Sequence, residues 1–355
     1  MIVIIGGTHH NTLSMIRSLG KKGVAVDVIL EDKEAKDSYV PSSIYINDCH
    51  YVENGEDAVD MLRANYPTNQ TVVVCSDDVA ALLDSNAARF MDKQVQVALA
   101  SKSGFNVPKS TVHIIGADTL NVPCYPCIVK PLESIHGGKR FAVCKDRGEL
   151  EMALNEYEAN DVVQIQEYIR KDEEIVVDGV SVKGDVVIPG YVLKHRDYLG
   201  GTTYSTTYPI CKLPEDICKM IRAMIAEMGY EGLFGVELIR SKENYYFVEI
   251  NLRNDATTYA LAVAGVNLPY IWVMGQLGMD YSIEAKGTIR EINSIVEFRD
   301  FPFALKGKIS LWKWWRDYRS CECKYFYDKR DLKPYRIARN QFFRSLFCKV
   351  LKRLR

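Results

Sequence analysis

The chain has 355 residues, of which 47% are apolar and 26% are charged, and its formal net charge is −1. These values are ordinary for a globular protein with a large core and two or three domains. Residues 1–335 carry a net charge of −8, which excludes nucleic-acid binding through a basic surface outside the last twenty residues.

The first ninety residues follow a strand–turn–helix–strand pattern. Ile2–Ile5 is a short apolar strand that runs into Gly6-Gly7-Thr8, and an amphipathic helix and a second strand at Val24–Leu30 follow it. Val72–Cys75 predicts a further buried strand, with a helix after Ser76. The pattern is typical of a parallel, Rossmann-like sheet. A dinucleotide site is disfavoured, because the two glycines lack the G-x-G-x-x-G spacing.

Two adjacent histidines, His9 and His10, follow the first strand. Ligands of parallel sheets bind beyond the carboxyl ends of the strands, so this position is compatible with the wall of a substrate cleft. Adjacent polar residues are equally typical of a turn, and both interpretations stay open. The first domain is expected to close near residue 90, and a helix is expected from there to about Ser103.

Two antiparallel strands and a glycine-containing loop follow. The strands are Cys127–Pro131 and Phe141–Cys144, and the loop between them contains His136-Gly137-Gly138-Lys139-Arg140. Glycine lets backbone N–H groups approach phosphate oxygens, and lysine adds positive charge, so the loop suits a phosphate lid. The alternative is a solvated hairpin tip.

Further strands are expected at residues 164–169, 175–182 and 186–192. The polar stretch after them, with Lys194, Arg196 and Gly200-Gly201, is expected to be a loop that holds a substrate or to be a plain surface loop. Pro214–Met228 is a clear amphipathic helix whose apolar stripe faces the core.

The clearest chemical signal is a predicted hairpin near residue 240. Its strands contain Glu237 on one side and Glu249, Asn251 and Arg253 on the other, with a turn at residues 241–244. Alternation places Glu249 and Asn251 on the same face, and Glu237 on the neighbouring strand. Two carboxylates and an amide oxygen are ligands that suit Mg²⁺ with substrate phosphates.

The order of these elements resembles the ATP-grasp superfamily of carboxylate–amine ligases, over residues 1 to about 285. The branch looks closest to D-aspartate ligase and the carbamoyl-phosphate-synthase-like ligases. The resemblance implies an α/β fold of the ATP-grasp type: a Rossmann-like pre-grasp domain (1–90), a two-lobed ATP-grasp domain (91–285, with a lid at about 109–165) and a C-terminal extension (286–355).

The resemblance also implies the cofactors and the residues that hold them. ATP would bind with Mg²⁺ or Mn²⁺, as two ions, and Glu237, Glu249 and Asn251 match the metal ligands. Arg253 matches a phosphate-contacting arginine, although Asn251-Leu-Arg replaces the commoner Asn-Pro-Arg. The ATP-binding positions are Lys93, Lys130, His136, Gly137, Gly138, Lys139, Gln166, Glu167, Tyr168, Ile169 and Glu174, with Glu173 as a competitor for the ribose.

The expected reaction converts a substrate carboxylate to an acyl-phosphate and couples it to an amine, with Arg253, Lys194 and Arg196 as the catalytic cations. Both substrates are expected to be small molecules, such as an amino acid or a derivative. Alternatives are a ligase with another nucleophile or a carboxyphosphate intermediate, and an ATP-binding regulatory module without turnover. An NAD-dependent oxidoreductase is the weakest alternative. A homodimer is an expectation from the family only.

The C-terminal tail, residues 336–355, has seven Lys or Arg and no acid. Phe343, Leu346, Phe347, Val350, Leu351 and Leu354 form one helical stripe among these charges. Such a basic amphipathic helix either lies on an anionic membrane surface, binds a partner protein or docks on the protein body. The ten cysteines lack framework spacing, and neither a signal peptide nor a spanning segment is evident, so a cytoplasmic protein is expected, with the inner membrane face as an alternative site.

Overall fold

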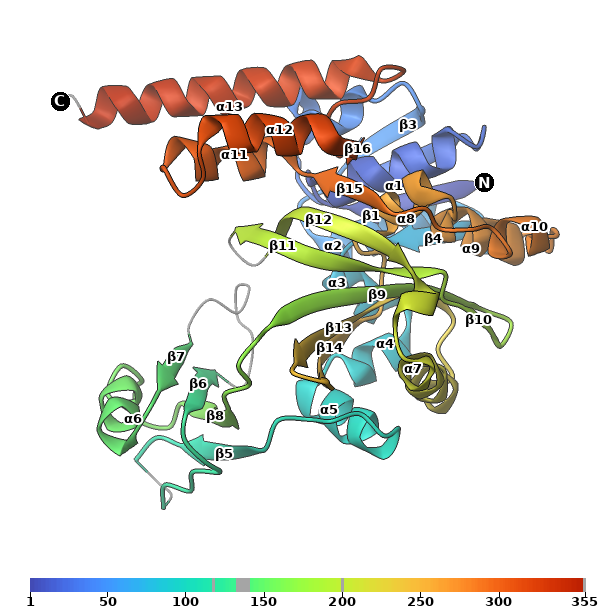
Figure 1. Ribbon diagram of the computed structural model, residues 1–355. Coiled ribbons are helices and arrows are strands. Elements are labelled where there is room, and N and C mark those ends of the chain that lie inside the picture. The colour runs from blue at the N-terminus through green and yellow to red at the C-terminus, as the bar shows by residue number, and fades with distance from the viewer. Residues whose placement is uncertain (117–118, 132–140, 199–200, 354–355) are drawn as a thin grey trace.

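The computed structural model describes residues 1–116, 119–131, 141–198 and 201–353, and three sheets organise this part of the chain (Figure 1). The first sheet is parallel, with strand order β3-β2-β1-β4, which confirms the Rossmann-like start. Its elements are β1 (Ile2–Gly6), α1 (His10–Gly20), β2 (Val26–Leu30), β3 (Ile46–Tyr51), α2 (Gly55–Asn65), β4 (Thr71–Val74), α3 (Asp77–Leu83) and α4 (Ser85–Phe90), with 3-10 turns at Ala35–Asp37 and Val40–Ser42.

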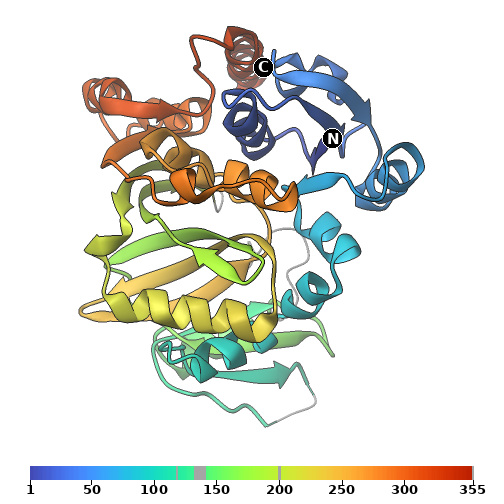
Figure 2. The same cartoon turned by 90° about the vertical axis from the view of Figure 1, so that its right-hand side faces the viewer.

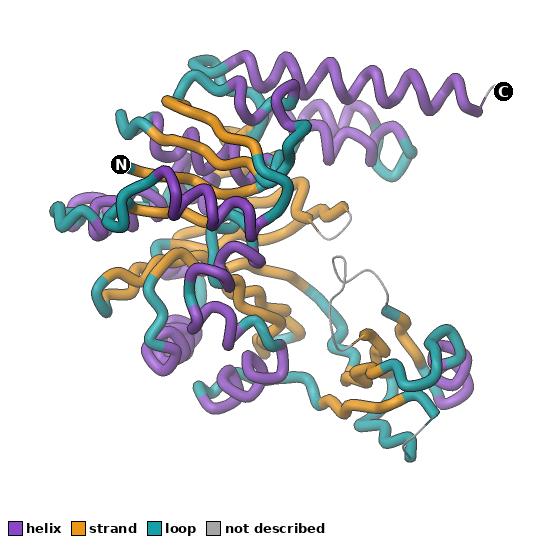
Figure 3. The backbone as a smooth tube through the Cα atoms, turned by 180° about the vertical axis from the view of Figure 1, so that it is seen from behind, coloured by secondary structure: helices purple, strands orange, loops and turns teal. Residues whose placement is uncertain are grey.

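The second sheet is small and lies apart from the rest of the protein, as Figure 3 shows from behind. It is antiparallel with strand order β5-β8-β6-β7, and one helix packs on it around a separate apolar core. The elements are β5 (Ser110–Ile114), β6 (Cys127–Pro131), β7 (Ala142–Cys144), α6 (Arg147–Leu154) and β8 (Val162–Glu167), and α5 (Lys93–Lys102) precedes them.

The third sheet forms the body of the protein and has eight strands in the order β14-β13-β9-β11-β12-β15-β16, with β10 paired to β9. The amphipathic helix α7 buries its apolar stripe against this sheet, as the sequence predicts. The elements are β9 (Glu173–Val182), β10 (Asp185–Val187), β11 (Gly190–Tyr198), β12 (Gly201–Pro209), a 3-10 turn (Ile210–Lys212), α7 (Glu215–Met228), β13 (Gly232–Ser241), β14 (Asn244–Asn251), α8 (Thr258–Ala264), α9 (Leu268–Gln276) and α10 (Ser282–Ala285).

One predicted loop is in fact a pair of strands. Lys194 and Arg196 lie within β11, and Gly201 begins β12, which pairs antiparallel with β11. Glycine and polar residues made this stretch look like a loop. However, Thr and Tyr favour strands, and polar side chains on a strand are expected where it faces a polar cavity.

The C-terminal segment continues the central sheet and closes over the first domain. Its elements are β15 (Ile292–Ile295), α11 (Glu297–Leu305), α12 (Leu311–Ser320), β16 (Cys321–Lys324) and α13 (Leu332–Arg353). The largest apolar core includes side chains of α1 and β2 together with side chains from residues 259–338. Figure 2 shows the first sheet (blue) and α13 (red) together at the top of the molecule.

A buried ion pair fastens this closure. The Arg17 side chain of α1 donates from Nε to Asp331 Oδ2 at 2.9 Å, and both side chains are fully buried. Its other nitrogens donate to the carbonyl oxygens of Tyr325, Phe326 and Asp331 at 2.8–3.1 Å. The guanidinium therefore ties the start of the chain to the loop before α13.

Among the described residues, no single helix is long and apolar enough to cross a membrane. The pair α8 and α9 passes that test only when the two are taken together, and they are bent by 95° at their junction.

Asp331→Ala should lower the free energy of unfolding by about 3–5 kcal/mol, because it leaves the Arg17 guanidinium buried without its counter-ion. Urea unfolding followed by circular dichroism measures this loss. The control is Lys102→Met, which breaks the exposed pair of Lys102 with Glu227 and should cost less than about 1 kcal/mol. Equal small losses in both variants would contradict the assigned role of Asp331.

Candidate active site

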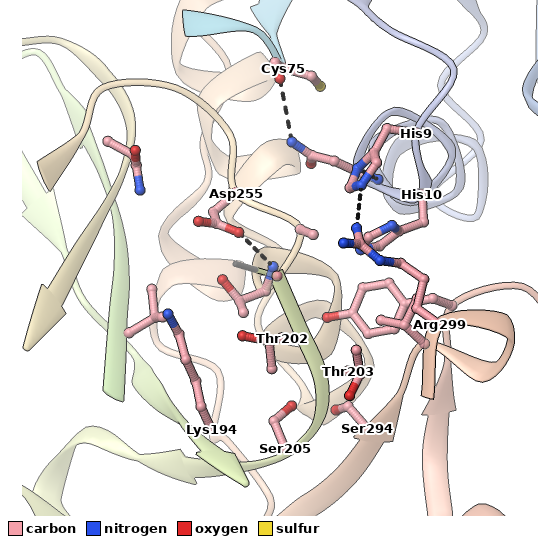
Figure 4. Close-up of a pocket in the computed structure, with 18 of the residues that line it drawn as sticks. His9, His10, Cys75, Lys194, Thr202, Thr203, Ser205, Asp255, Ser294 and Arg299 are labelled. Atoms are coloured by element: carbon pink, nitrogen blue, oxygen red, sulfur yellow. Dashed lines mark hydrogen bonds between the residues drawn. The ribbon is translucent and has the colours of Figure 1, made fainter. Parts of the chain in front are cut away.

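A polar cavity of about 380 Å³ lies where the first sheet, the central sheet and the C-terminal segment meet. Its walls come from the β1–α1 turn, from β11 and β12, from the β13–β14 hairpin and from α11. Figure 4 shows the labelled residues of this cavity arranged around a shared space, with Lys194 and Arg299 on different sides of it. Six of the residues predicted from the sequence line it: Lys194, Gly201, Glu237, Glu249, Asn251 and Arg253.

The β13–β14 hairpin places the predicted metal ligands together. Glu237 lies directly opposite Glu249, and Asn251 lies opposite Gly235 in the antiparallel register. Burial raises the pKa of Glu237, and the Glu249 carboxylate raises it further, although Lys194 opposes both effects. Two neighbouring carboxylates in a partly buried site are favourable only with positive charge nearby.

Lys194 supplies that charge on the protein side. Its Nζ donates to Glu237 Oε2 at 2.9 Å and to Glu174 Oε1 at 2.8 Å. Burial alone would lower the pKa of Lys194, but the two carboxylates outweigh it and raise the pKa well above its usual value. Lys194 is therefore charged at every physiological pH.

The contact with Lys194 distinguishes Glu174 from Glu173, the two candidates for the ribose-binding acid. Glu174 shares Lys194 with Glu237, whereas Glu173 points to Arg240, with Glu173 Oε1 at 2.7 Å from Arg240 Nη2. Burial would raise the pKa of Glu174, but Lys194 and Lys171 reverse this and lower it. Glu174 is thus an ionised carboxylate on the side of the predicted metal ligands.

Two further lysines lie beside the hairpin. Lys93 Nζ is 3.3 Å from Glu249 Oε2, and Lys130 Nζ donates to Gln166 Oε1 at 3.0 Å. The pKa of Lys130 is lowered, first by burial and then by the charge of Lys93. Two cations close enough to repel each other would be stabilised by a polyanion such as a triphosphate.

Arg253 is held at the edge of the cavity by three acceptors. Its guanidinium donates to Asp77 Oδ1 at 2.7 Å, to the Asn254 carbonyl at 3.1 Å and to Asn251 Oδ1 at 3.3 Å. The next residue, Asn254, is fully buried. Its Nδ2 donates to Asn11 Oδ1 of α1 at 2.5 Å, and Asn11 Nδ2 donates to the Asn254 backbone carbonyl at 3.0 Å. The first domain thereby positions the end of β14.

Other predicted residues lie outside the cavity. Arg196 donates to Asp300 and to Asp317 at 2.7–2.9 Å and lies over the Tyr204 ring, so its guanidinium is occupied by α11 and α12. Gln166, Glu167, Tyr168 and Ile169 lie at and just after the end of β8. His136, Gly137, Gly138, Lys139 and Gly200 fall outside the described residues.

The donor set of the hairpin fits a magnesium ion. No group of three or more His, Cys, Asp or Glu side chains within the described ranges is arranged to hold a metal by itself. The hairpin instead offers two carboxylates and one amide oxygen, and the raised pKa of Glu237 shows a site that a cation would stabilise. Mg²⁺ commonly takes one or two protein carboxylates and completes its shell with water and phosphate oxygens.

Sequence reasoning missed part of the cavity wall. Val296, Arg299 and Tyr325 line the cavity but carry no motif that marks them. His9 and His10, whose role the sequence left open, line it as well. Arg299 belongs to α11, which the sequence analysis placed in an extension without a role.

Comparisons with known proteins agree with this geometry. Residues 160–299 match the family model described as "ATP-grasp in the biosynthetic pathway with Ter operon". The carbamoyl phosphate synthase large chain of Clostridium acetobutylicum is 31% identical over 156 residues, which cover 40% of this chain and 14% of that one. The formate-dependent phosphoribosylglycinamide formyltransferase of Bacillus subtilis is 33% identical over 138 residues, which cover 36% of this chain and 35% of that one.

Solved structures show the same fold. An L-amino acid ligase from Bacillus licheniformis superposes with a TM-score of 0.62 at 16% identity and covers 83% of this chain and 79% of its own. An N5-carboxyaminoimidazole synthetase from Staphylococcus aureus, complexed with ADP, superposes with a TM-score of 0.66 at 13% identity and covers 86% and 85%.

The fold and the family match together identify an ATP-grasp domain in this chain. Within that class, residues 160–299 are similar to the ATP-grasp described for the biosynthetic pathway with the Ter operon. The resemblance to carbamoyl-phosphate-synthase-like ligases is confirmed by the relatives. The matches span only about a seventh and about a third of the length of these two relatives.

Lys194→Met should destabilise the protein more at high pH than at low pH. At pH 8 the variant leaves Glu174 and Glu237 ionised without their shared cation, which should cost about 3 kcal/mol. Toward pH 5 the cost should shrink, because protonation of the carboxylates relieves their repulsion. Urea unfolding of the wild type and the variant at both pH values measures the difference.

The control for this prediction is Lys212→Met, which breaks an exposed pair with Glu291. It should change stability by less than about 1 kcal/mol at either pH. A loss in Lys194→Met that is the same at pH 8 and pH 5 would mean that Lys194 acts through packing and not through its charge.

Proposed function

We propose that this protein is an ATP- and Mg²⁺-dependent ligase that activates a substrate carboxylate as an acyl-phosphate and couples it to an amine. The observation that carries the proposal is the meeting of Glu237, Glu249 and Asn251 with four cations, Lys93, Lys130, Lys194 and Arg253, at one polar cavity and its edge. A site of this composition suits phosphoryl transfer, where positioning and charge stabilisation supply most of the catalysis.

Each residue of the candidate site has a separate task in this proposal. Lys93 and Lys130 bind the phosphate groups, and Glu174 binds the ribose. When bound, Mg²⁺ offsets the negative charge that develops during phosphoryl transfer. Glu237, Glu249 and Asn251 would hold it. Lys194 favours the ionised forms of Glu174 and Glu237 and fixes their orientation.

Arg253 faces the cavity from the end of β14 and is suited to orient the phosphoryl group or the acyl-phosphate. The attacking carboxylate oxygen forms a bond to the γ-phosphorus, and the bond to the bridging oxygen of ADP breaks. The amine then attacks the acyl carbon, phosphate leaves, and the amine proton passes to a base. Enclosure of the cavity limits hydrolysis of the acyl-phosphate in between.

The relatives differ in substrate, so they leave the substrate of this chain open. One solved neighbour is named an L-amino acid ligase, and another is an N5-carboxyaminoimidazole synthetase. Amino acids and their derivatives are the carboxylates that we propose first, because the cavity is polar and of a size that suits a small molecule.

Turnover should be detectable as ADP release with Mg²⁺-ATP in a matrix of D- and L-amino acids and amines, with hydroxylamine present to trap acyl-phosphate as hydroxamate. Glu249→Gln should reduce turnover by at least about 100-fold, because it removes one metal-binding charge from the site. Hydroxamate that forms with one carboxylate would name half of the substrate pair.

The matched control is Glu243→Gln, at the exposed turn of the same hairpin. It should retain wild-type turnover, since Glu243 lies at the far end of the strands from the cavity. ATP binding without ADP release across the whole matrix would favour the alternative, an ATP-binding regulatory module without turnover.

We also propose that the end of α13 contacts an anionic lipid surface. Its first half is fastened to the body, with Phe342 against Phe298, whereas Phe343 and Phe347 are 53% and 64% exposed. The tail around them is basic and contains no acid. Exposed aromatic side chains within a basic helix match the chemistry of a negatively charged membrane surface.

Co-sedimentation with phosphatidylcholine vesicles, with and without phosphatidylglycerol, tests this surface. Binding should need the anionic lipid and fall with added salt, and Phe343→Ser with Phe347→Ser should weaken it roughly tenfold or more. Phe141→Ser, which changes an exposed phenylalanine of the small sheet, should leave binding unchanged. Vesicle binding that does not depend on the anionic lipid, or that the double substitution does not weaken, would contradict the proposal.

A further inference from the structure

Three cations line the cavity, and one of them differs from the other two. Lys194 contacts Glu174 and Glu237, and Arg253 contacts Asp77. Within the described part of the chain, no carboxylate forms an ion pair with the third cation, Arg299. Its guanidinium donates to the Tyr198 carbonyl at 3.0 Å and faces His9 Nε2 at 2.9 Å. Arg299 therefore brings a positive charge to the cavity that the protein does not neutralise by direct pairing.

The contact between Arg299 and His9 cannot be satisfied fully by these groups alone. The His9 Nδ1 atom accepts the backbone N–H of Asn11 at 3.3 Å, which caps helix α1. A neutral imidazole has only one acceptor nitrogen, so Nε2 then carries the proton. Nε2–H and the guanidinium are both donors and face each other. In the other tautomer Nε2 accepts from Arg299 and Nδ1 carries the proton, so Nδ1–H and the Asn11 N–H are then the two donors that face each other.

Protonation of His9 does not resolve the conflict. Burial between the cavity walls, followed by the charge of Arg299, lowers the pKa of His9 to about 4, so the ring is neutral at pH 7. A charged imidazolium would in any case present two donors and face a second cation. The arrangement lacks an acceptor, which a ligand oxygen between the two side chains would provide.

The surroundings favour a negatively charged ligand at this place. The N-terminus of α1, an 11-residue helix without acidic residues in its first turn, lines the same part of the cavity. Such a terminus adds partial positive charge. The Arg299 side chain lies against Gly201, where an added Cβ would be 3.1 Å from Nη2. The Tyr198 carbonyl and Gly201 thus keep the Arg299 guanidinium at the cavity, and no carboxylate of the described residues pairs with it.

We propose that Arg299 and His9 form a subsite for an oxyanion group, either a carboxylate or a phosphate, on the substrate that brings the amine. The proposal rests on the proposed function and names a chemical class for one of its two substrates. The oxyanion accepts from the guanidinium and from Nε2–H, which converts two opposed donors into two donors to one acceptor group.

The rest of such a substrate would point toward the centre of the cavity. Asp255 lines the same cavity, and its carboxylate is near enough to both His9 and Glu237 for its charge to favour a higher pKa of each. A substrate with its oxyanion on Arg299 would therefore present its amine toward Asp255, on the way to the predicted phosphate and metal site. This orientation suits attack on an acyl-phosphate held near Glu237 and Glu249.

Calorimetric titration of three small amines tests the subsite. Glycine carries a carboxylate, phosphoethanolamine carries a phosphate, and ethanolamine has no oxyanion. The protein is first saturated with Mg²⁺ and the non-hydrolysable ATP analogue AMP-PNP, so that the phosphate-binding lysines are already occupied. The wild type should bind glycine or phosphoethanolamine more tightly than ethanolamine, and the preferred ligand names the oxyanion.

Arg299→Gln should weaken binding of the preferred ligand at least about tenfold, with binding of AMP-PNP unchanged, because charged hydrogen bonds to an oxyanion are lost. His9→Asn should weaken it less, and asparagine preserves the helix cap. The control is Arg290→Gln, an exposed arginine that pairs with Glu322 away from the cavity, and it should behave as the wild type.

The outcomes separate this proposal from the proposed function. A wild type that does not bind AMP-PNP with Mg²⁺ would overturn the proposed function. If AMP-PNP binds normally, three results would overturn the subsite alone. The wild type could bind ethanolamine as tightly as the other two ligands, it could bind none of the three, or Arg299→Gln could keep the preference of the wild type. Unfolding curves of each variant confirm that losses do not come from misfolding.

Discussion

Lys194 is the charge on which the arrangement of the cavity depends. The order β13-β9-β11 in the central sheet brings Glu237, Glu174 and Lys194 together from three strands. Without this lysine, two partly buried carboxylates would repel each other next to a third, Glu249, and burial favours their neutral forms. Lys194 opposes this effect at Glu174 and Glu237 and fixes the directions of both side chains, so that Glu237 can offer an oxygen atom to a metal ion.

The walls of the cavity depend on how the three parts of the chain are fastened. The Asn11–Asn254 amide pair joins α1 to the end of β14, and the Arg17–Asp331 pair joins α1 to the C-terminal segment. Both contacts are buried and polar, so they specify one arrangement of the parts, whereas apolar packing tolerates small shifts. They bring the β1–α1 turn next to α11, with His9 against Arg299, beside the predicted phosphate and metal residues.

The family match and the cavity overlap only in part. The matched range, residues 160–299, contains Glu174, Lys194 and the whole hairpin with Glu237 and Glu249. The β1–α1 turn and Tyr325, which also line the cavity, lie outside that range. The matched range thus contains the predicted metal ligands, whereas Lys93 and Lys130, the proposed phosphate-binding lysines, lie outside it. The proposed oxyanion subsite joins both parts, because His9 lies outside the matched range and Arg299 is its last residue.

The sequence by itself determined the local elements that carry the chemistry. Alternation along Gly232–Asn251 predicted a hairpin with Glu237, Glu249 and Asn251 together, because side-chain direction in strands follows from spacing alone. The tertiary structure alone decided that Lys194 on β11 contacts both Glu174 and Glu237. It also decided that Arg196 pairs with Asp300 and Asp317, and that Arg299 reaches the cavity. Such ion pairs join residues 20 to 121 positions apart, and no local pattern encodes which charged groups the packing of distant segments brings into contact.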